Sequence, residues 1–572
     1  MMSALATAAD TNARLTAADT QRGRVLWLGL FIATLGVAAF LRFWGIRWGL
    51  PNVQRLGSYH PDEAVNLFSG VLLNGVARPH LDIGFYNYGS FYFLLWQVGI
   101  AVNSTYGFIR PPATPGSNPA ESIAAMVLTG RILTALAGTL TCAVLLGASR
   151  LFERRVVGAA AAACYAVAPI AVVHGHFATV DGTATMLVAA VMVVALVLVR
   201  QPRVMYASWA GLLAGLAGAT RYNAILCVLM PFAAVLLSVR NGQSGLPIRR
   251  WQMVGAVMLG CIIGFLVGCP GAILNWSKFT ADLLFEMQKS REGMGLLFAG
   301  TGLGWVYHYT VSLRHGLGQQ LLTLVTAGFL GSLLRRDRDT LVILAFLVPY
   351  YVLMGAAQVR FARYMLPLLP PLFLLSSMTL CRLVSLRRAS AAGLALFLGG
   401  FLPALHSSIA YSMQMSRQDA RDAAADFIRR RAPHGASIAF ATVPWYWSPP
   451  LLPEFTAPLP GQVRRKLILA AASEYILRLP SEGREWDTGV LVGNEPCMVV
   501  ISDLEAQDAM RLRVPESLRF LAVAEQGRAR ISFGLRPSFL GLPGATNGYL
   551  PNDLLYVCPR VTLYVPKPWL RH

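Results

Sequence analysis

Two adjacent carboxylates, Asp62 and Glu63, end the segment Tyr59–Glu63 (Tyr-His-Pro-Asp-Glu), just beyond the first long apolar stretch of the chain. A charge beside a membrane-spanning segment is costly unless it is paired, hydrated or used for function. Neighbouring carboxylates at a low-dielectric boundary do not both ionise freely, which raises one pKa and suits general-base work on a hydroxyl group. The structural alternative is a helix start, with Pro61 as its first residue and both acids at the positive end of the dipole.

A second polar group, His174-Gly-His176 followed by Asp181, lies between two apolar stretches. Asp181 stands at the mouth of an apolar helix, where an unpaired carboxylate needs a partner. We therefore expect it to be a second catalytic acid. Two histidines and an aspartate at this spacing also suit a divalent metal, although loop histidines more often serve as polar caps. No cofactor is certain, and the metal candidates are His174 and His176.

Three arginines, Arg221, Arg360 and Arg363, stand close to the ends of apolar stretches. A guanidinium group is a forked donor that binds phosphate well, whereas the alternative role is snorkelling toward lipid headgroups. A phosphate leaving group needs positive charge more than it needs a proton, while an attacking hydroxyl needs a base. Acids and arginines together therefore fit the transfer of a sugar from a lipid-linked phosphate to a hydroxyl.

The composition shows what kind of scaffold must hold these residues. Hydrophobic residues make up 55% of the 572 residues and charged residues only 13%, and the mean hydropathy is +0.52. A soluble protein with an ordinary surface does not have this balance, so we expect an α-helical polytopic membrane protein.

About eleven stretches are apolar enough to be transmembrane helices, each crossing about 30 Å of hydrocarbon. They are residues 25–44, 123–148, 156–173, 183–199, 206–218, 224–239, 253–270, 317–334, 341–355, 365–380 and 391–411. The run from 206 to 239 is too long for one helix, and Arg221 divides it into two.

The short loops that contain arginine alternate along the chain, which satisfies the positive-inside rule if the N-terminus is cytoplasmic. Asp62, Asp181 and the three arginines then share the outer side. This topology accounts for most of the net charge of +21, and no basic patch with interleaved aromatics is present, which argues against nucleic acid as a partner. Motifs of P-loop ATPases, serine hydrolases and HExxH metalloproteases are also missing.

The chain divides by composition into three parts. Residues 1–24 are rich in Ala and Thr and are expected to be a disordered cytoplasmic N-terminus. Residues 25–411 form the membrane domain, whose first external loop covers about 47–122. Residues 412–572 contain a polar helix and strand-like runs at 437–441 and 497–501, which predicts a small extracytoplasmic α/β domain.

Cys497 and Cys558 are the two cysteines of this C-terminal part, and the other six lie in or beside apolar stretches. An extracytoplasmic compartment permits a disulfide, so this pair is a disulfide candidate. The alternative is two unrelated buried thiols.

Several short motifs, taken in their order along the chain, resemble the GT-C membrane glycosyltransferases. They are Tyr59–Glu63, Asn87-Tyr88-Gly89, Gly130–Gly138 with Arg150-Leu-Phe152, Ala178–Asp181, Thr220-Arg-Tyr222 and Arg363-Tyr364-Met-Leu-Pro367. Within that group the sequence is most similar to the family 39 branch, which includes protein mannosyltransferases and the lipid A aminoarabinose and galacturonic acid transferases. The resemblance covers roughly residues 25–411.

The resemblance implies a GT-C fold in a multi-pass inner membrane protein that acts as an inverting glycosyltransferase. Its partners would be a polyprenyl-phosphate sugar donor and a hydroxyl acceptor in the cell envelope, namely a glycolipid, a polysaccharide or a protein. In the family the first-loop acid is the catalytic base, which falls on Asp62 with Glu63 beside it, and the second acid falls on Asp181.

The remaining expected site residues come from the same motifs. Arg221 replaces a basic residue that is often Lys in relatives, and it would bind the donor phosphate together with Arg360, Arg363 and Tyr364. His60, Asn87 and Tyr88 are the expected substrate-binding residues. The rival function is a transporter or flippase of lipid-linked sugars, which would more often show inverted repeats and charges at mid-membrane.

Overall fold

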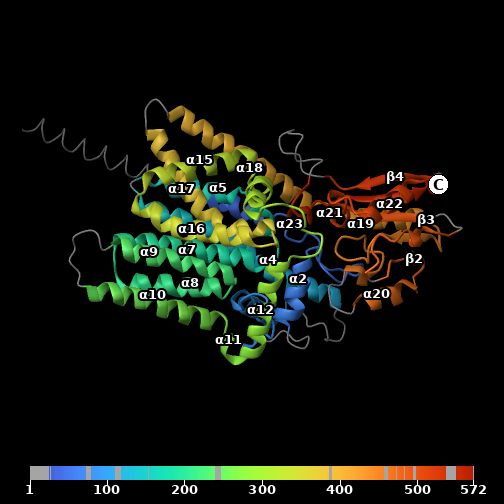
Figure 1. Ribbon diagram of the computed structural model, residues 1–572, viewed down its shortest axis with the longest axis horizontal. Coiled ribbons are helices and arrows are strands. Elements are labelled where there is room, and N and C mark those ends of the chain that lie inside the picture. The colour runs from blue at the N-terminus through green and yellow to red at the C-terminus, as the bar shows by residue number, and fades with distance from the viewer. Residues whose placement is uncertain are drawn as a thin grey trace, which may run out of the picture.

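The computed structural model describes most of the chain. The described residues are 25, 27–72, 79–107, 109, 118–152, 154–238, 247–385, 390–456, 462–471, 473–481, 483–493, 497–535 and 549–570. The expected N-terminal part, residues 1–24, lies outside them. A bundle of helices occupies one end of the molecule and a small sheet the other, with helices α2 (Pro61–Val65) and α23 (Asn552–Leu555) between them (Figure 1).

Six helices of the described chain are long and apolar enough to cross a membrane. They are Pro119–Leu151, Val180–Arg200, Ile248–Gly268, Arg338–Ala356, Ala362–Val384 and Ala391–Arg431. Four shorter apolar helices are Trp27–Phe43, Val156–Ala166, Val204–Gly218 and Tyr222–Ser238. Each of the eleven expected spans coincides with one of these helices or with α15 (Gln319–Arg335). The prediction of a helical polytopic membrane protein is confirmed.

The elements that carry the argument below have the following bounds. They are α3 (Phe91–Thr105), α4 (Pro119–Ala148), α5 (Val156–Ala166), α6 (Pro169–His174), α7 (Val180–Arg200), α8 (Val204–Gly218), α9 (Leu229–Ser238), α10 (Pro247–Gly268), α12 (Trp276–Glu292), α16 (Arg338–Ala356), α17 (Leu369–Ser385), α18 (Ser390–Met415) and α19 (Ala420–Arg431). Two 3-10 helices, Tyr222–Val228 and Ala362–Leu368, precede α9 and α17.

Helices α8 and α10 pack closely, with backbone against backbone. Gly211 and Gly215 of α8 leave no room for a Cβ because backbone atoms of α10 occupy that space, and Gly260 and Gly264 of α10 meet α8 in the same way. Small residues four apart let two helices in lipid approach backbone to backbone. This contact fixes the end of α8, beyond which Arg221 is in extended conformation (φ −147°, ψ 117°).

The C-terminal part is built on a five-stranded sheet with the strand order β2-β1-β3-β5-β4. Its strands are β1 (Ser437–Phe440), β2 (Ile476–Arg478), β3 (Cys497–Ser502), β4 (Arg528–Phe533) and β5 (Val561–Pro566). β2, β1 and β3 are parallel, and β5 runs antiparallel to β3 and β4. Helices α19, α20 (Gln462–Ala471), α21 (Asp503–Arg511) and α22 (Pro515–Glu525) accompany the sheet. The expected C-terminal α/β fold is confirmed.

The segment between β4 and β5 connects the sheet to the helical bundle. Leu554 and Leu555 of α23 are fully buried and belong to the same apolar cluster as the core of the bundle. The sheet is therefore packed onto the bundle rather than suspended from it, and α23 brings polar side chains of the C-terminal part to the ends of the membrane helices.

Candidate active site

Helix α2 starts as the sequence predicts, yet its two acids face different surroundings. Pro61 is its first residue, and Nδ1 of the preceding His60 accepts a hydrogen bond from the Asp62 amide at 3.3 Å. Glu63 is fully buried, whereas the Asp62 side chain is 27% exposed. The two carboxylates therefore need separate descriptions.

Glu63 is held in a clamp made with Arg131 of α4. The guanidinium donates from Nε to Glu63 Oε1 (2.7 Å) and from Nη2 to Oε2 (2.6 Å), and the Ala178 amide also donates to Oε1 (2.8 Å). The third nitrogen, Nη1, donates to the carbonyls of Ile46 (2.8 Å) and Trp48 (2.5 Å). Neither charged side chain is exposed to solvent. We call these residues the Glu63 clamp; its forked geometry ties together four segments of the chain.

Asp62 belongs to a different group, the Asp62 cluster, which contains Asp62, Asp181, Arg221, Arg363 and Tyr364. Nη2 of Arg363 lies 2.8 Å from Asp62 Oδ2, and its Nε lies 3.8 Å from Asp181 Oδ2. Arg221 contacts Asp181 Oδ1 directly, and its guanidinium carbon lies 4.3 Å from the centre of the Tyr364 ring. The structure thus brings together five residues that the sequence singled out.

Apart from Asp62 on the short helix α2, each member of the Asp62 cluster stands where a membrane helix begins or ends. Asp181 is in the first turn of α7, and Arg221 lies between α8 and the 3-10 helix Tyr222–Val228. Arg363 and Tyr364 occupy the 3-10 helix Ala362–Leu368 that leads into α17. Helix ends are the places in an apolar bundle where charge is cheapest to hold and closest to water.

The electrostatics of Asp62 keep it ionised. Burial alone would raise the pKa of this carboxyl, but the positive charge of Arg363, assisted by Lys289 and Arg221, outweighs burial and lowers the pKa below its ordinary value. Only Oδ2 is engaged by Arg363; Oδ1 forms no hydrogen bond with any residue that the structure describes. Nη1 of Arg363 is likewise buried without a hydrogen-bond partner in the described chain. The Asp62–Arg363 pair therefore retains an unused acceptor and an unused donor.

The C-terminal part adds Asp553 of α23, which the sequence did not single out. Its Oδ2 accepts the backbone amide of Arg363 at 2.8 Å and lies 3.5 Å from His174 Nε2, and the side chain is fully buried. Burial raises the pKa of Asp553 above its ordinary value. Nothing in the sequence placed Asp553 near Arg363, because 190 residues separate them. The carboxyl fixes the backbone that presents Arg363 to Asp62.

Helix α12 supplies a charged rim that the sequence also did not identify. Asn87 Nδ2 donates to Glu286 Oε1 at 2.7 Å, and Lys289 Nζ lies 3.3 Å from the same oxygen. Tyr88 follows Asn87; burial raises the pKa of its phenol above the ordinary value, and the charges of Asp62 and Arg363 both act on that pKa. The closely spaced charges of α12, which stand between two apolar stretches, are the signal that could have located this rim.

The two predicted metal ligands, His174 and His176, lie against separate partners. Both ring nitrogens of His176 lie against backbone carbonyls, 2.8 Å from Val172 O and 3.0 Å from Trp44 O. His174 faces Asp553 instead. Among the described residues there is no group of three His, Cys, Asp or Glu side chains that could hold a metal ion. The metal prediction for His174 and His176 stays a prediction, and the structure lends it no support because their ring nitrogens point to separate partners.

His60, an expected substrate-binding residue, is enclosed by aromatic rings. Its ring lies 4.3 Å from that of Phe177 and 5.0 Å from that of Tyr556, measured between centroids. Burial lowers the pKa of His60 to about 4, so the imidazole is neutral at ordinary pH. In this arrangement His60 caps α2, and its Nδ1 accepts the backbone amide of Asp62.

Arg360, the third predicted phosphate ligand, is not brought to the Asp62 cluster. Its Nη1 donates to Thr301 Oγ1 (2.6 Å) and to Gly302 O (2.8 Å), and its Nε donates to Ala357 O (3.1 Å). These bonds attach the loop before α13 (Gly304–Tyr307) to the loop after α16. The sequence does not distinguish the surroundings of Arg360 from those of Arg363, only three residues away, because both stand beside the same apolar stretch.

The predicted disulfide between Cys497 and Cys558 is also wrong. Neither cysteine is in a disulfide. The Cys497 thiol donates to the Met498 carbonyl inside β3, and Cys558 packs with the apolar core of the bundle. Their side chains belong to different apolar clusters, so the alternative of two separate buried thiols describes the structure.

Comparisons with known proteins agree with the sequence resemblance. Residues 126–267, from α4 into α10, match the model of the dolichyl-phosphate-mannose-protein mannosyltransferase family. This segment, which contains Arg131, Asp181 and Arg221, is homologous to glycosyltransferases. The curated proteins include no match to the chain.

Several solved structures are similar to this one. ArnT from Cupriavidus metallidurans bound to undecaprenyl phosphate is 15% identical, with 85% of this chain and 94% of that chain covered and a TM-score of 0.46. The apo oligosaccharyltransferase of Archaeoglobus fulgidus is 13% identical, with 92% and 75% covered and a TM-score of 0.48. The arabinofuranosyltransferase AftD from Mycobacteria is 16% identical, with 74% and 31% covered and a TM-score of 0.42.

Proposed function

We propose that this chain, whose residues 126–267 match a family of lipid-phosphate-dependent glycosyltransferases, moves a sugar from a polyprenyl-phosphate donor to a hydroxyl of an extracytoplasmic acceptor. The acceptor is a glycolipid, a polysaccharide or a protein of the cell envelope. One observation carries the proposal: the partly exposed Asp62 carboxylate lies 2.8 Å from Arg363, and each of these two side chains keeps one polar atom unused.

In the proposed reaction Asp62 is the general base. Its Oδ1 takes the proton of the acceptor hydroxyl while the hydroxyl oxygen forms a bond to the anomeric carbon, on the face opposite the phosphate. The bond between that carbon and the phosphate oxygen breaks, and polyprenyl phosphate leaves with the bonding electrons. Attack from the opposite face inverts the anomeric configuration. A positioned base of this kind contributes roughly 10²–10⁴-fold to a rate.

Arg363 and Arg221 are assigned to the donor phosphate. The unused Nη1 of Arg363 offers a charge-assisted hydrogen bond to a phosphate oxygen, and Arg221 adds a second positive charge on the other side of Asp181. Charge held in place before the leaving group develops stabilises the transition state without reorganisation. Tyr364 keeps the Arg221 guanidinium against its ring.

Donor binding also strengthens the base. The pKa of Asp62 is low mainly because the charge of Arg363 overcomes the effect of burial. A phosphate at Arg363 shares that charge, so the pKa of Asp62 rises and the carboxylate becomes a better proton acceptor when the donor is in place.

The test is a transfer assay with the purified chain in lipid, a labelled polyprenyl-phosphate sugar and membrane extract as the acceptor. Wild type is compared with Asp62→Asn and with Glu121→Gln, which removes an exposed carboxylate in the first turn of α4. We expect labelled acceptor and released polyprenyl phosphate with wild type and Glu121→Gln, but not with Asp62→Asn. Transfer by Asp62→Asn at the wild-type rate would overturn the assignment. Movement of intact donor across the bilayer without transfer would instead identify a flippase.

A further inference from the structure

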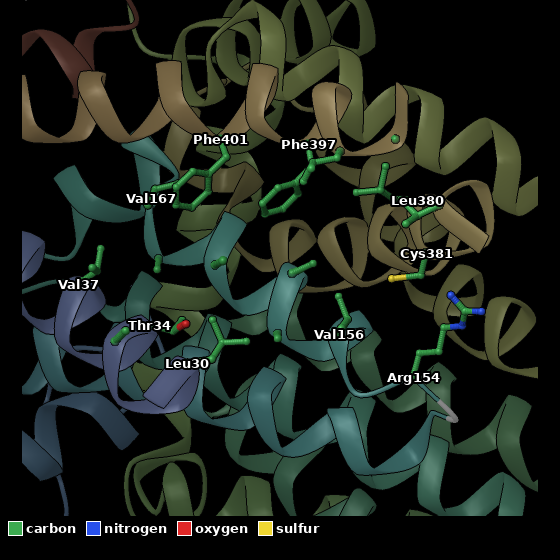
Figure 2. A pocket seen from close by; sticks show the side chains of 18 of the residues that line it. Leu30, Thr34, Val37, Arg154, Val156, Val167, Leu380, Cys381, Phe397 and Phe401 are labelled. Carbon is green, nitrogen blue, oxygen red and sulfur yellow. The ribbon is translucent and has the colours of Figure 1, made fainter. Parts of the chain in front are cut away.

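A large apolar groove lies in the half of the bundle away from the Asp62 cluster. It has a volume of about 1020 Å³ and is lined by the helix Trp27–Phe43 together with α5, α17 and α18. Leu30, Val37, Leu380, Phe397 and Phe401 line it (Figure 2). Its polar lining is limited to Thr34, Cys381 and Arg154. Such a lining suits hydrocarbon rather than a sugar or a peptide.

Among the residues that the structure describes, the lining of the groove contains one charged side chain, and it lies at one end. Figure 2 shows Arg154 beside Cys381, while Val37, Val167 and Phe401 lie toward the opposite end. The Arg154 side chain is exposed and forms no ion pair or hydrogen bond with another residue that the structure describes. It belongs to a loop that the arginine pattern assigns to the cytoplasmic side, where anionic headgroups gather. Its guanidinium is therefore placed to bind a lipid phosphate at the mouth of a hydrocarbon groove.

A buried arginine lies near the other end of the groove, where Val37 and Ala166 line it. Arg42, which is fully buried, donates to the carbonyls of Ala38 (3.0 Å), Tyr165 (3.2 Å) and Ala166 (3.2 Å). These bonds tie the helix Trp27–Phe43 to the end of α5, and they stand between the groove and the turn that contains His174 and His176. A lipid in the groove consequently enters with its tails first and its headgroup at Arg154.

Size and position identify the occupant. At about 30 Å³ for a group the size of water or a methylene, the groove holds on the order of thirty such groups, which is the hydrocarbon of two ordinary acyl chains. Cys381 lies twelve residues along α17 from Leu369, about 18 Å at 1.5 Å per residue, and Arg363 precedes Leu369. A phosphate at Arg154 is therefore too far from Arg363 for the lipid to serve as sugar donor.

We propose that this groove binds one anionic glycerophospholipid, with its two acyl chains between α5 and α18 and its phosphate at Arg154. The site is distinct from the donor site and does not depend on the proposed glycosyl transfer. Because the lipid fills a gap between helices that otherwise lack contact there, it stabilises the folded bundle by mass action.

Native mass spectrometry of the full chain tests this, after equilibration with equal amounts of phosphatidylglycerol, phosphatidylethanolamine and polyprenyl phosphate. Wild type should retain one phosphatidylglycerol. Arg154→Gln should reduce that retention at least threefold and Ala163→Phe, which fills the groove from α5, at least tenfold. The matched controls are Arg155→Gln, next to Arg154 but outside the lining, and Gly399→Phe on α18, where an added Cβ meets nothing. Both controls should behave as wild type.

Thermal unfolding gives a second measurement in case Ala163→Phe does not fold. The Tm of wild type should rise with added phosphatidylglycerol, and that of Arg154→Gln should not. Equal phosphatidylglycerol retention by wild type and both groove variants would overturn the proposal. So would equal retention of phosphatidylethanolamine by wild type, or displacement of phosphatidylglycerol by polyprenyl phosphate.

Discussion

The Glu63 clamp and the Asp62 cluster start from neighbouring residues of one short helix and use charge in opposite ways. In the clamp, Glu63 and Arg131 are fully buried, and each nitrogen of the guanidinium has a partner. In the cluster, Asp62 is 27% exposed, its Oδ1 is unused, and Nη1 of Arg363 is buried without a partner in the described chain. A carboxylate and an arginine thus form one site in which every guanidinium nitrogen has a partner and one site with an unused donor and an unused acceptor.

The two sites differ in what their charged groups do: those of the clamp hold the fold together, whereas those of the cluster remain available to a ligand. A buried ion pair whose hydrogen bonds are all satisfied has nothing left to offer a ligand, and losing one partner leaves an uncompensated charge. A buried arginine N–H without an acceptor destabilises the protein, and an anion that binds to this N–H removes the free-energy penalty. Perturbed carboxyls with unused atoms mark functional sites more reliably than acidity alone. On this basis we assign Glu63, which the sequence placed beside the expected base, to positioning α2, and we propose Asp62 alone as the base.

The largest expected effect is on the clamp. Arg131→Gln leaves Glu63 buried without its partner and should lower the free energy of unfolding by about 3–5 kcal/mol. The double variant Glu63→Gln/Arg131→Gln removes both charges and should recover part of that loss. Thermal unfolding in lipid measures both, with Arg155→Gln as the exposed control. A single variant as stable as wild type would show that the clamp is not structural.

The next effect distinguishes the two arginines near α17. Arg363→Gln should reduce sugar transfer by roughly 10²–10³-fold, or about 3–4 kcal/mol of transition-state stabilisation. Arg360→Gln, whose bonds go to Thr301 and loop carbonyls, should cost about 1 kcal/mol of stability and leave transfer per folded molecule unchanged. Steady-state kinetics of both variants provide the comparison. An equal loss of transfer in the two variants would show that Arg360 also acts at the donor site.

A smaller effect concerns the pH dependence of transfer. In the free chain Asp62 is ionised above its lowered pKa, so kcat/KM for transfer should persist into acid solution and fall only as the pH drops through that value. Lys289 contributes to the lowering, so Lys289→Gln raises the pKa and should move the acid limb of the pH–rate profile to higher pH. Arg291→Gln, on the same helix, is the control. A limb that stays in place would exclude Asp62 as the titrating group.

The smallest effect is expected at the rim. Asn87→Ala removes the hydrogen bond to Glu286, which is worth about 0.5–1.5 kcal/mol. We expect an increase in KM of up to roughly tenfold with little change in kcat, because the rim orients substrate without touching the base. A loss confined to kcat would instead place Asn87 within the reacting group.

Most of the fold could be predicted from the sequence because lipid imposes a simple rule on length and hydropathy. The eleven expected spans correspond to helices, and Arg221 does divide the run from 206 to 239. The strands β1 and β3 were also predicted, since each is a continuous apolar run in a polar segment. β2 and β4 were not predicted, because β2 has three residues and the exposed side of β4 resembles a loop. β5 was missed although its buried apolar run carries the same signal as β1 and β3.

The candidate site could be predicted only where charge interrupts an apolar pattern. Asp62, Asp181, Arg221 and Arg363 share that signal, and the structure brings them together. Which residues pair by tertiary contact does not follow from this signal: Asp553 reaches Arg363 from the far end of the chain, and Arg131, a charge inside the apolar run 123–148, pairs with Glu63 rather than with Asp62. The separation of Glu63 from Asp62, and of Arg360 from Arg363, depends on which way each side chain points, which no spacing in the sequence records.

The most direct test of the central claim measures sugar transfer and thermal unfolding for Asp62→Asn and Glu63→Gln in the same lipid preparation. Asp62→Asn should lose roughly 10²–10⁴-fold in kcat and unfold at close to the wild-type temperature. Glu63→Gln should unfold at a clearly lower temperature and keep most of its transfer per folded molecule. Wild-type transfer by Asp62→Asn, together with inactive but stable Glu63→Gln, would contradict the account and make Glu63 the base.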